Sequence, residues 1–265
     1  MNRIEKRMEE LKAKNEKAFI TYYTAGLPDM ETTEKIIEAQ RGVTDVIELG
    51  IPFSDPTADG PVIQQASYEA IQKGASLKRA FELMDKIRKG GNEQPVVFMM
   101  YYNTILNYGL DTFIKKCAQT GVDGLIVPDL PLEEQETLRD SLKGNDNTIL
   151  IELVSPVSGG RIPGILKGAR GFVYCVSSMG VTGQAADFHK EVIGYLSKVK
   201  SISSIPVMMG FGIREASDIV PMKDIIDGAI VGSHFINIMR DSGFDPDAAR
   251  EYVTRFKREM NKGGM

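Results

Sequence analysis

The residues best suited to chemistry are three acids between positions 48 and 59. Glu48 stands within an apolar run at 46–49, and Asp55 and Asp59 follow in a loop rich in proline and glycine. A carboxyl group among apolar side chains loses hydration, so its pKa rises and it can exchange protons near neutral pH. For Glu48 a structural role is equally open, in which the carboxylate forms a salt bridge with a Lys or Arg. An isolated Asp in this loop would more often cap the helix expected near Pro61.

Three glycine-bearing segments indicate an anion site. They cover positions 177–183, 210–213 and 232–233, and each follows a short apolar run. Glycine lets backbone N–H groups approach an anion closely, and the N-terminus of the following segment adds a favourable dipole. We therefore expect a phosphate site there, and tight turns alone are the less favoured explanation.

Aromatic and thioether side chains occur where the apolar runs end, at Tyr22, Met100, Tyr101 and Tyr174. They predict that the other end of the substrate is apolar or aromatic, although any one of them could simply fill the core. Asp129 also follows an apolar run, and for it we favour a capping or scaffold role.

Several classes of function are excluded or unsupported. The 32 Lys and Arg against 36 Asp and Glu give a net charge of -4, which argues against nucleic-acid binding. Two cysteines are too few for a disulfide framework and lack metal-ligand spacing. His189 and His234 have no partners at the spacing of a catalytic triad, and neither a metal nor a dinucleotide motif is present.

The elements that must position these residues alternate between strands and helices. Apolar β-rich runs occupy positions 18–24, 44–49, 95–101, 124–127, 148–154, 171–176, 205–209 and 228–231. Runs that are apolar throughout are typical of parallel strands covered on both faces. Eight such runs with helical segments between them predict a (β/α)8 TIM barrel, in which functional groups lie at the C-terminal strand ends. An open doubly wound sheet is the rival fold.

The helical segments carry recognisable start signals. Ser76, Asp29 and Asp245 stand where N-caps are expected, and an extra N-terminal helix is predicted to bury Ile4, Met8 and Leu11. The stretch from Leu49 to Ser76 predicts an extended second βα loop, of the kind that is usually functional. We expect a single domain over residues 1–265, because this length fits one barrel of about 250 residues. Without a signal peptide or membrane span, the expected location is the cytoplasm.

Four motifs resemble those of one known family. The runs at positions 48–61 (ELGIPFSDPTADGP) and 171–183 (GFVYCVSSMGVTG), with GFGI at 210–213 and VGS at 231–233, are similar to the alpha subunit of tryptophan synthase. The resemblance covers nearly the whole chain, including the N-terminal helix. It implies a lyase that cleaves indole-3-glycerol phosphate to indole and glyceraldehyde 3-phosphate.

The resemblance also implies a role for each matching residue. Glu48 would be the general acid and base, Asp59 would face the indole N–H, and Tyr174 would support the catalytic geometry. Tyr22, Met100 and Tyr101 would line the indole end. The phosphate would be held around Gly183, Gly212, Gly232 and Ser233, with Thr182 closing onto Asp59.

The implied partner is a beta subunit in an alpha2beta2 complex, with pyridoxal phosphate bound only in that subunit. The chain itself is expected to need no cofactor and no metal. Three alternatives remain: a stand-alone lyase that releases free indole, a non-catalytic barrel that only binds a partner, and a lyase or isomerase for another phosphosugar.

Overall fold

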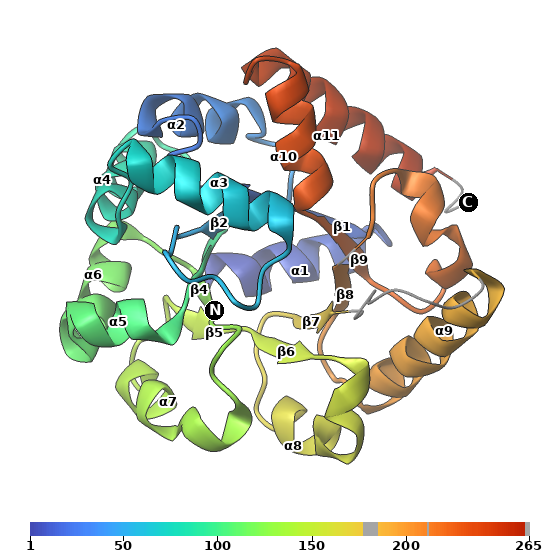
Figure 1. The fold of residues 1–265 in the computed structure, drawn as a ribbon. Coiled ribbons are helices and arrows are strands. Elements are labelled where there is room, and N and C mark those ends of the chain that lie inside the picture. The colour runs from blue at the N-terminus through green and yellow to red at the C-terminus, as the bar shows by residue number, and fades with distance from the viewer. Residues whose placement is uncertain (177–184, 211, 263–265) are drawn as a thin grey trace.

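Parallel strands form a ring surrounded by helices (Figure 1). This computed structural model describes residues 1–176, 185–210 and 212–262. The strands are β1 (Ala18–Thr24), β2 (Val46–Gly50), β3 (Val96–Met99), β4 (Gly124–Ile126), β5 (Ile149–Leu150), β6 (Glu152–Val154), β7 (Val173–Val176), β8 (Val207–Gly210) and β9 (Gly228–Val231). Hydrogen bonds join them in the order β5-β4-β3-β2-β1-β9-β8-β7-β6, with every pair parallel.

The ring closes through one stretch of chain that pairs on both sides. β5 pairs with β4, and β6, which begins two residues after β5 ends, pairs with β7. The residue between them, Ile151, donates its N–H to the Leu125 carbonyl at 2.9 Å. β5 and β6 are therefore two halves of the fifth barrel strand, and the expected (β/α)8 barrel is confirmed.

The helices alternate with the strands and follow the expected start signals. They are α1 (Arg3–Ala13), α2 (Met30–Ala39), α3 (Pro61–Gln72), α4 (Leu77–Lys89), α5 (Tyr102–Tyr108), α6 (Leu110–Thr120), α7 (Glu136–Leu142), α8 (Ile162–Leu166), α9 (Ala185–Ile202), α10 (Ser233–Asp241) and α11 (Pro246–Asn261). Short 3-10 helices cover Leu132–Glu134, Pro156–Arg161 and Ala216–Met222. The side chains of Asp29, Ser76 and Asp245 cap α2, α4 and α11 as predicted. α3 is the extra element in the extended second βα loop.

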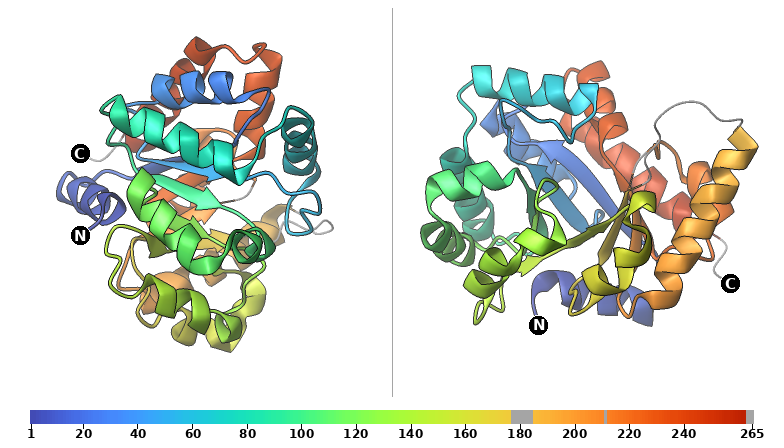
Figure 2. Two further views of the ribbon diagram at one scale, coloured as in Figure 1. Left: turned by 90° about the vertical axis from the view of Figure 1, so that its left-hand side faces the viewer. Right: turned by 60° about the horizontal axis from the view of Figure 1, so that its bottom comes forward.

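The N-terminal helix closes the barrel at the N-terminal end of the strands. Ile4, Met8 and Leu11 of α1 are buried, and they pack against inward-facing side chains such as Ile20 and Val97. Figure 2 shows α1 lying across the N-terminal end of the strands. The predicted extra helix is thus the floor of the barrel, and the open end is the one where the βα loops gather.

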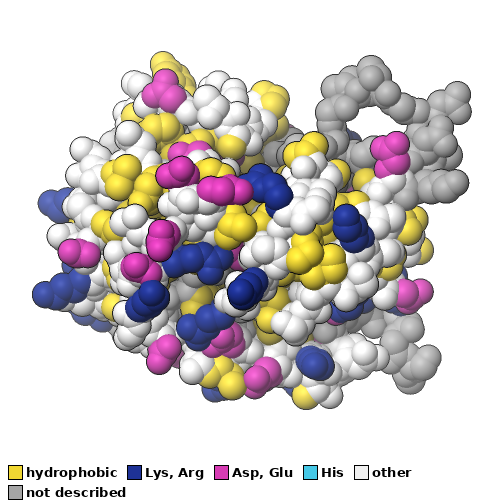
Figure 3. Space-filling model, turned by 90° about the horizontal axis from the view of Figure 1, so that it is seen from below, with side chains coloured by type: hydrophobic (Ala, Val, Ile, Leu, Met, Phe, Trp, Pro, Cys, Tyr) yellow, Lys and Arg dark blue, Asp and Glu magenta, His cyan; other side chains and the backbone are white. Residues whose placement is uncertain are grey.

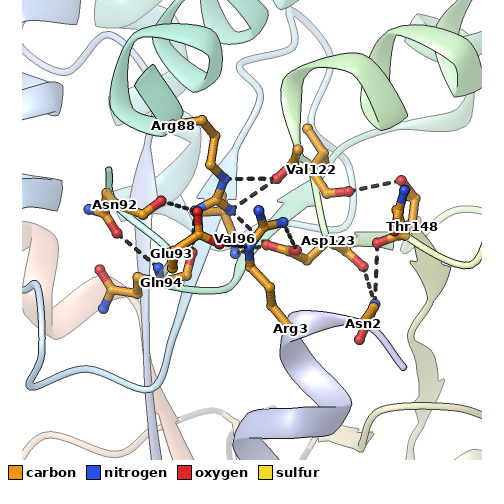
Figure 4. Close-up of polar contacts among 12 residues, drawn as sticks. Asn2, Arg3, Arg88, Asn92, Glu93, Gln94, Val96, Val122, Asp123 and Thr148 are labelled. Carbon is orange, nitrogen blue, oxygen red and sulfur yellow. Dashed lines mark hydrogen bonds and ion pairs between the residues drawn. The ribbon is translucent and has the colours of Figure 1, made fainter. Parts of the chain in front are cut away.

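Three aspartates stand directly before β2, β4 and β9 at this closed end. The carboxylates of Asp45, Asp123 and Asp227 each accept a backbone N–H from the preceding barrel strand, at 2.7, 2.8 and 2.7 Å. Their basic partners are Arg7 and Lys257 for Asp45, Arg3 and Arg88 for Asp123, and Lys200 for Asp227. Figure 4 shows Arg3 and Arg88 converging on Asp123. These groups tie α1 and the outer helices to the strand starts.

The outer surface mixes charges of both signs. On the side of α7 and α8, Lys and Arg side chains alternate with Asp and Glu, and hydrophobic side chains are scattered between them (Figure 3). No helix in the described ranges is long and apolar enough to cross a membrane.

Candidate active site

Glu48 lies inside the barrel, near the C-terminal ends of the strands. It is in register with Tyr22 of β1 and Val97 of β3, and its relative exposure is only 1%. Neither carboxylate oxygen has a hydrogen-bond partner in the described part of the chain, and no salt bridge to Glu48 is found there. Burial, with a smaller contribution from nearby Asp59, raises the pKa of Glu48 to about 8. Glu48 is therefore desolvated as predicted, and the alternative of a salt bridge is not found in the described structure. Its part in proton transfer stays a prediction.

Asp59 is held by a tyrosine rather than by a helix. The Tyr101 hydroxyl donates to Asp59 Oδ2 at 3.1 Å. Burial raises the pKa of Asp59 to about 6, and the hydrogen bond from Tyr101 opposes that rise. The idea that an Asp of this loop caps the next helix is wrong: the N-cap of α3 is Gly60, which has no side chain to bond. The Asp59 carboxylate is instead directed to Tyr101.

Two tyrosine rings lie near Glu48, and each packs against a glycine of the strand next to its own. Tyr22 pairs with Glu48, and Gly50 follows two residues later on the same face of β2. A Cβ at Gly50 would lie 2.1 Å from the Tyr22 hydroxyl, so any larger residue would displace the ring. Tyr174 and Gly210 repeat this arrangement on β7 and β8, with a Tyr174 atom 2.6 Å from such a Cβ. Burial raises the pKa of both tyrosines and keeps their hydroxyls protonated.

One cavity of about 750 Å³ joins the two acids to two of the glycine-bearing segments, at Gly212 and at Gly232 and Ser233. Seven of the predicted site residues line it: Tyr22, Glu48, Asp59, Tyr174, Gly212, Gly232 and Ser233. Thr182 and Gly183 were also predicted, and they lie outside the described residues. The two acids and the two described segments where an anion is expected thus line the same cavity, as a substrate with a phosphate and an apolar end requires.

The expectation that Met100 and Tyr101 line the apolar end needs correction. Side chains alternate along extended chain, so Met99, the last residue of β3, points into the cavity. Met100, the next residue, points outward and packs in the buried core beneath α4 to α6. Tyr101 is not among the described lining residues, and its hydroxyl donates to Asp59, which does line the cavity. The apolar wall instead includes side chains of later strands and loops that sequence reasoning missed, namely Val127, Leu130, Leu132, Leu150 and Leu153. Their apolar character fits core residues equally well, so no signal separated them.

Asp129 is a scaffold residue, as predicted. Its two carboxylate oxygens accept the Tyr102 N–H at 2.9 and 3.2 Å. Since Tyr102 is the first residue of α5, Asp129 satisfies a backbone donor at the start of that helix. It thereby joins the ends of the third and fourth barrel strands.

The end of the cavity where an anion is expected includes the backbone around Gly212 and Gly232. Gly212 has φ +72°, a left-handed conformation that favours glycine, and Gly232 precedes α10, whose first residue is Ser233. The free N–H groups at the start of α10 suit a phosphate. His234 and Asn237, in the first turns of α10, line the cavity too and were missed, because neither belongs to a motif.

A family model described as tryptophan synthase alpha chain matches residues 8–264. The chain belongs to the tryptophan synthase alpha chain family. A tryptophan synthase alpha chain from Lachnospira eligens is 59% identical over 263 residues, which cover 98% of this chain and 100% of that one.

Solved structures of the tryptophan synthase alpha fold agree with this membership. Tryptophan synthase subunit alpha from Legionella pneumophila is 33% identical with a TM-score of 0.87, over 98% of both chains. A chain of the tryptophan synthase complex from Pyrococcus furiosus is 31% identical with a TM-score of 0.80, over 92% of this chain and 97% of that one.

Tryptophan synthase alpha chains are lyases. The family cleaves indole-3-glycerol phosphate to indole and glyceraldehyde 3-phosphate in tryptophan biosynthesis. The described cavity combines two carboxyl groups whose pKa burial raises, an apolar wall and the backbone at the start of α10.

Proposed function

We propose that the described cavity is where this chain cleaves indole-3-glycerol phosphate, with Glu48 moving the protons. The observation that carries the proposal is the state of Glu48: a buried carboxyl group without a hydrogen-bond partner among the described residues, in a cavity that Asp59 and the anion end share. A structural acid would be paired, whereas a free one is ready to meet a substrate atom.

A single carboxyl group can serve both proton transfers of the cleavage. With its pKa at about 8, Glu48 is mostly protonated near pH 7 and can deliver its proton to C3 of the indole ring. The resulting carboxylate then removes the proton of the side-chain hydroxyl next to the ring. The hydroxyl carbon becomes a carbonyl, the C–C bond breaks, and its electron pair returns to the ring. Glu48 ends protonated, as it began.

The other site residues would support this step. Protonation at C3 places positive charge on the indole nitrogen, and Asp59, with its pKa at about 6, is largely ionised at neutral pH and can stabilise that charge. Tyr174, whose ring packs against Gly210, would support the geometry of the cavity around Glu48. Gly212, Gly232 and Ser233 would bind the phosphate, whose remote binding energy can be used at the reacting carbon. Thr182 and Gly183 keep the roles given by the resemblance.

The chain is also expected to have a protein partner. We infer that the chain acts with a tryptophan synthase beta subunit in an alpha2beta2 complex, with pyridoxal phosphate bound only by that subunit. Membership of the alpha chain family supports this partnership, as does the likeness to a chain of the Pyrococcus furiosus complex. The alternative of a stand-alone lyase shares the same acids, so only turnover with and without a beta subunit separates the two.

We propose that residues 1–265 act as one domain, since a single sheet runs from β1 to β9 and α11 packs against α2. We propose the cytoplasm as the place of action, which is consistent with two cysteines that are free and buried.

The test is to incubate the purified chain, alone and with a beta subunit, with indole-3-glycerol phosphate and to measure indole. We expect slow release alone and faster release with the partner. Glu48→Gln should abolish release, whereas Ser233→Asp should raise KM with little change in kcat, because its charge repels the phosphate. Most activity remaining in Glu48→Gln would disprove the mechanism. A wild-type chain that releases no indole but still binds a beta subunit would favour the non-catalytic alternative.

A further inference from the structure

We propose that Tyr101 is a positioning residue, which holds the Asp59 carboxylate and its loop in the working orientation while Asp129 fixes Tyr101 from the next barrel strand. The proposal rests on the function given above, because orienting Asp59 matters only if Asp59 acts on the substrate. It replaces the expected task of Tyr101, which was to line the apolar end.

A single hydroxyl group carries the contact between Tyr101 and the loop. Its oxygen accepts the Ala58 N–H at 2.9 Å, and its proton is donated to Asp59 Oδ2 at 3.1 Å. The Tyr101 side chain is buried, with 5% relative exposure, so water competes little for these bonds. One atom thus fixes both the backbone and the acidic side chain of consecutive residues.

The Tyr101 ring holds the same loop at a second place. It stacks on Phe53, with ring centroids 5.0 Å apart and an interplanar angle of 22°. Within the loop itself, Asp59 donates its N–H to the Pro56 carbonyl at 3.1 Å, which shapes the turn but leaves the carboxyl group free. Among the described residues, the hydrogen bond that orients this carboxyl group comes from Tyr101.

Asp129 holds Tyr101 in turn. It accepts the N–H of Tyr102, the neighbour of Tyr101, through both carboxylate oxygens. Tyr101 is the N-cap residue of α5 and makes no side-chain cap of its own, so Asp129 is the acid at that helix start. Because Asp129 itself is solvent-exposed, it can be substituted with little risk to the core.

The hydroxyl also favours the ionised form of Asp59. A donor aimed at a carboxylate stabilises its charge, and this contact lowers the pKa of Asp59 against the effect of burial. The other titratable groups around Asp59 in the described structure are Glu48, which is acidic, and the neutral Tyr22 and Tyr174. Removing the Tyr101 hydroxyl should therefore make Asp59 harder to ionise and less well oriented.

The test compares Tyr101→Phe, Asp129→Ala and the control Tyr108→Phe in the full chain, with indole release from indole-3-glycerol phosphate measured against pH. Tyr101→Phe keeps the ring and its stack on Phe53. We expect kcat to fall about tenfold, the acid limb of the kcat profile to move up by roughly half a pH unit or more, and KM to change little. Asp129→Ala should act in the same direction but more weakly, about two- to fivefold.

Tyr108→Phe is matched because Tyr108 packs its ring on Phe81 and makes no hydrogen bond through its hydroxyl in the described structure. Its profile should equal that of the wild type. An unchanged kcat and pH profile in Tyr101→Phe would overturn the proposal, as would a raised KM with an unmoved profile, which marks a substrate-lining residue. Circular dichroism verifies folding, and Asp129→Ala decides the question if Tyr101→Phe is unstable. A wild-type chain that releases no indole would instead contradict the proposed function.

Discussion

At the closed end of the barrel, Asp45 and Asp123 are buried and fully engaged, whereas at the open end Glu48 is equally buried and has no partner in the described structure. Asp123 accepts from Arg3 at 3.0 Å, from Arg88 at 2.7 Å and from the Val96 N–H at 2.8 Å. Asp59, with one hydrogen bond from Tyr101, resembles Glu48 more than it resembles the acids below.

This contrast separates acids that stabilise the fold from acids that are available for chemistry. The oxygen atoms of a paired carboxylate are already used by salt bridges and backbone N–H groups, so they have no capacity left for a substrate. An unpaired buried carboxyl group costs stability, and it persists where that cost serves another purpose. Burial alone therefore does not distinguish the two ends, but the number of hydrogen-bond and salt-bridge partners of the carboxylate oxygens does.

The largest expected effect is on activity at the open end. Glu48→Gln keeps the size of the side chain and removes proton transfer, so indole release should fall by about 10³-fold or more. Thermal unfolding at pH 7 should show a fold at least as stable as the wild type, because a neutral amide replaces an acid that resists ionisation. If Glu48→Gln is inactive because it does not fold, then Glu48 serves stability, as the acids of the closed end do.

The next effect is on stability at the closed end. Asp123→Ala should cost about 3–5 kcal/mol of unfolding free energy, because it leaves the Val96 N–H, Arg3 and Arg88 without their shared partner. Urea denaturation measures this loss. Activity per folded molecule should stay unchanged at low temperature. A fall in kcat larger than the loss of folded protein would show that the closed end also contributes to chemistry.

The unfolding free energy should depend on pH through the ionisation of Glu48. Its folded pKa, about 8, lies above its ordinary value, so the stability tied to its protonated form is complete at low pH. That stability is lost as pH rises from about 4.5 towards 8, on the order of 2–4 kcal/mol. Unfolding measured at pH 5, 6.5 and 8 should show Glu48→Gln gaining on the wild type as pH rises. Parallel curves for the two proteins would mean that Glu48 is not desolvated.

The smallest effect concerns Asp227, the most exposed of the three aspartates at the closed end. Lys200 and Asp227 are 41% and 35% exposed, so Lys200→Ala should change the unfolding free energy by no more than about 0.5 kcal/mol. Asp227→Ala should cost more, about 1–2 kcal/mol, because it also removes the acceptor of the Val207 N–H. Equal losses from both variants would mean that the charge, not the backbone contact, is what Asp227 contributes.

The sequence predicts the barrel and its acids well because both have local signals. Apolar runs identify the strands, and Glu48 stands out as a charged residue within one of them. Contacts between distant positions have no such signal. The Arg3–Asp123 bond spans 120 residues and the Tyr101–Asp59 bond spans 42, so neither could be inferred from spacing. The expectation that Met100 lines the cavity failed because an apolar run does not show at which residue a strand ends or which of its sides faces inward.

The floor made by α1 limits the route that molecules can take. Ile4, Met8 and Leu11 fill the base of the barrel among the inward-facing side chains of the strands, which leaves no passage downward in the described structure. Substrate and both products must then cross the same rim, and a phosphorylated product and an apolar one leave by a shared exit. Any protein that takes indole directly from this chain has to dock over that rim, on the βα loops, and not on the helices around the sides.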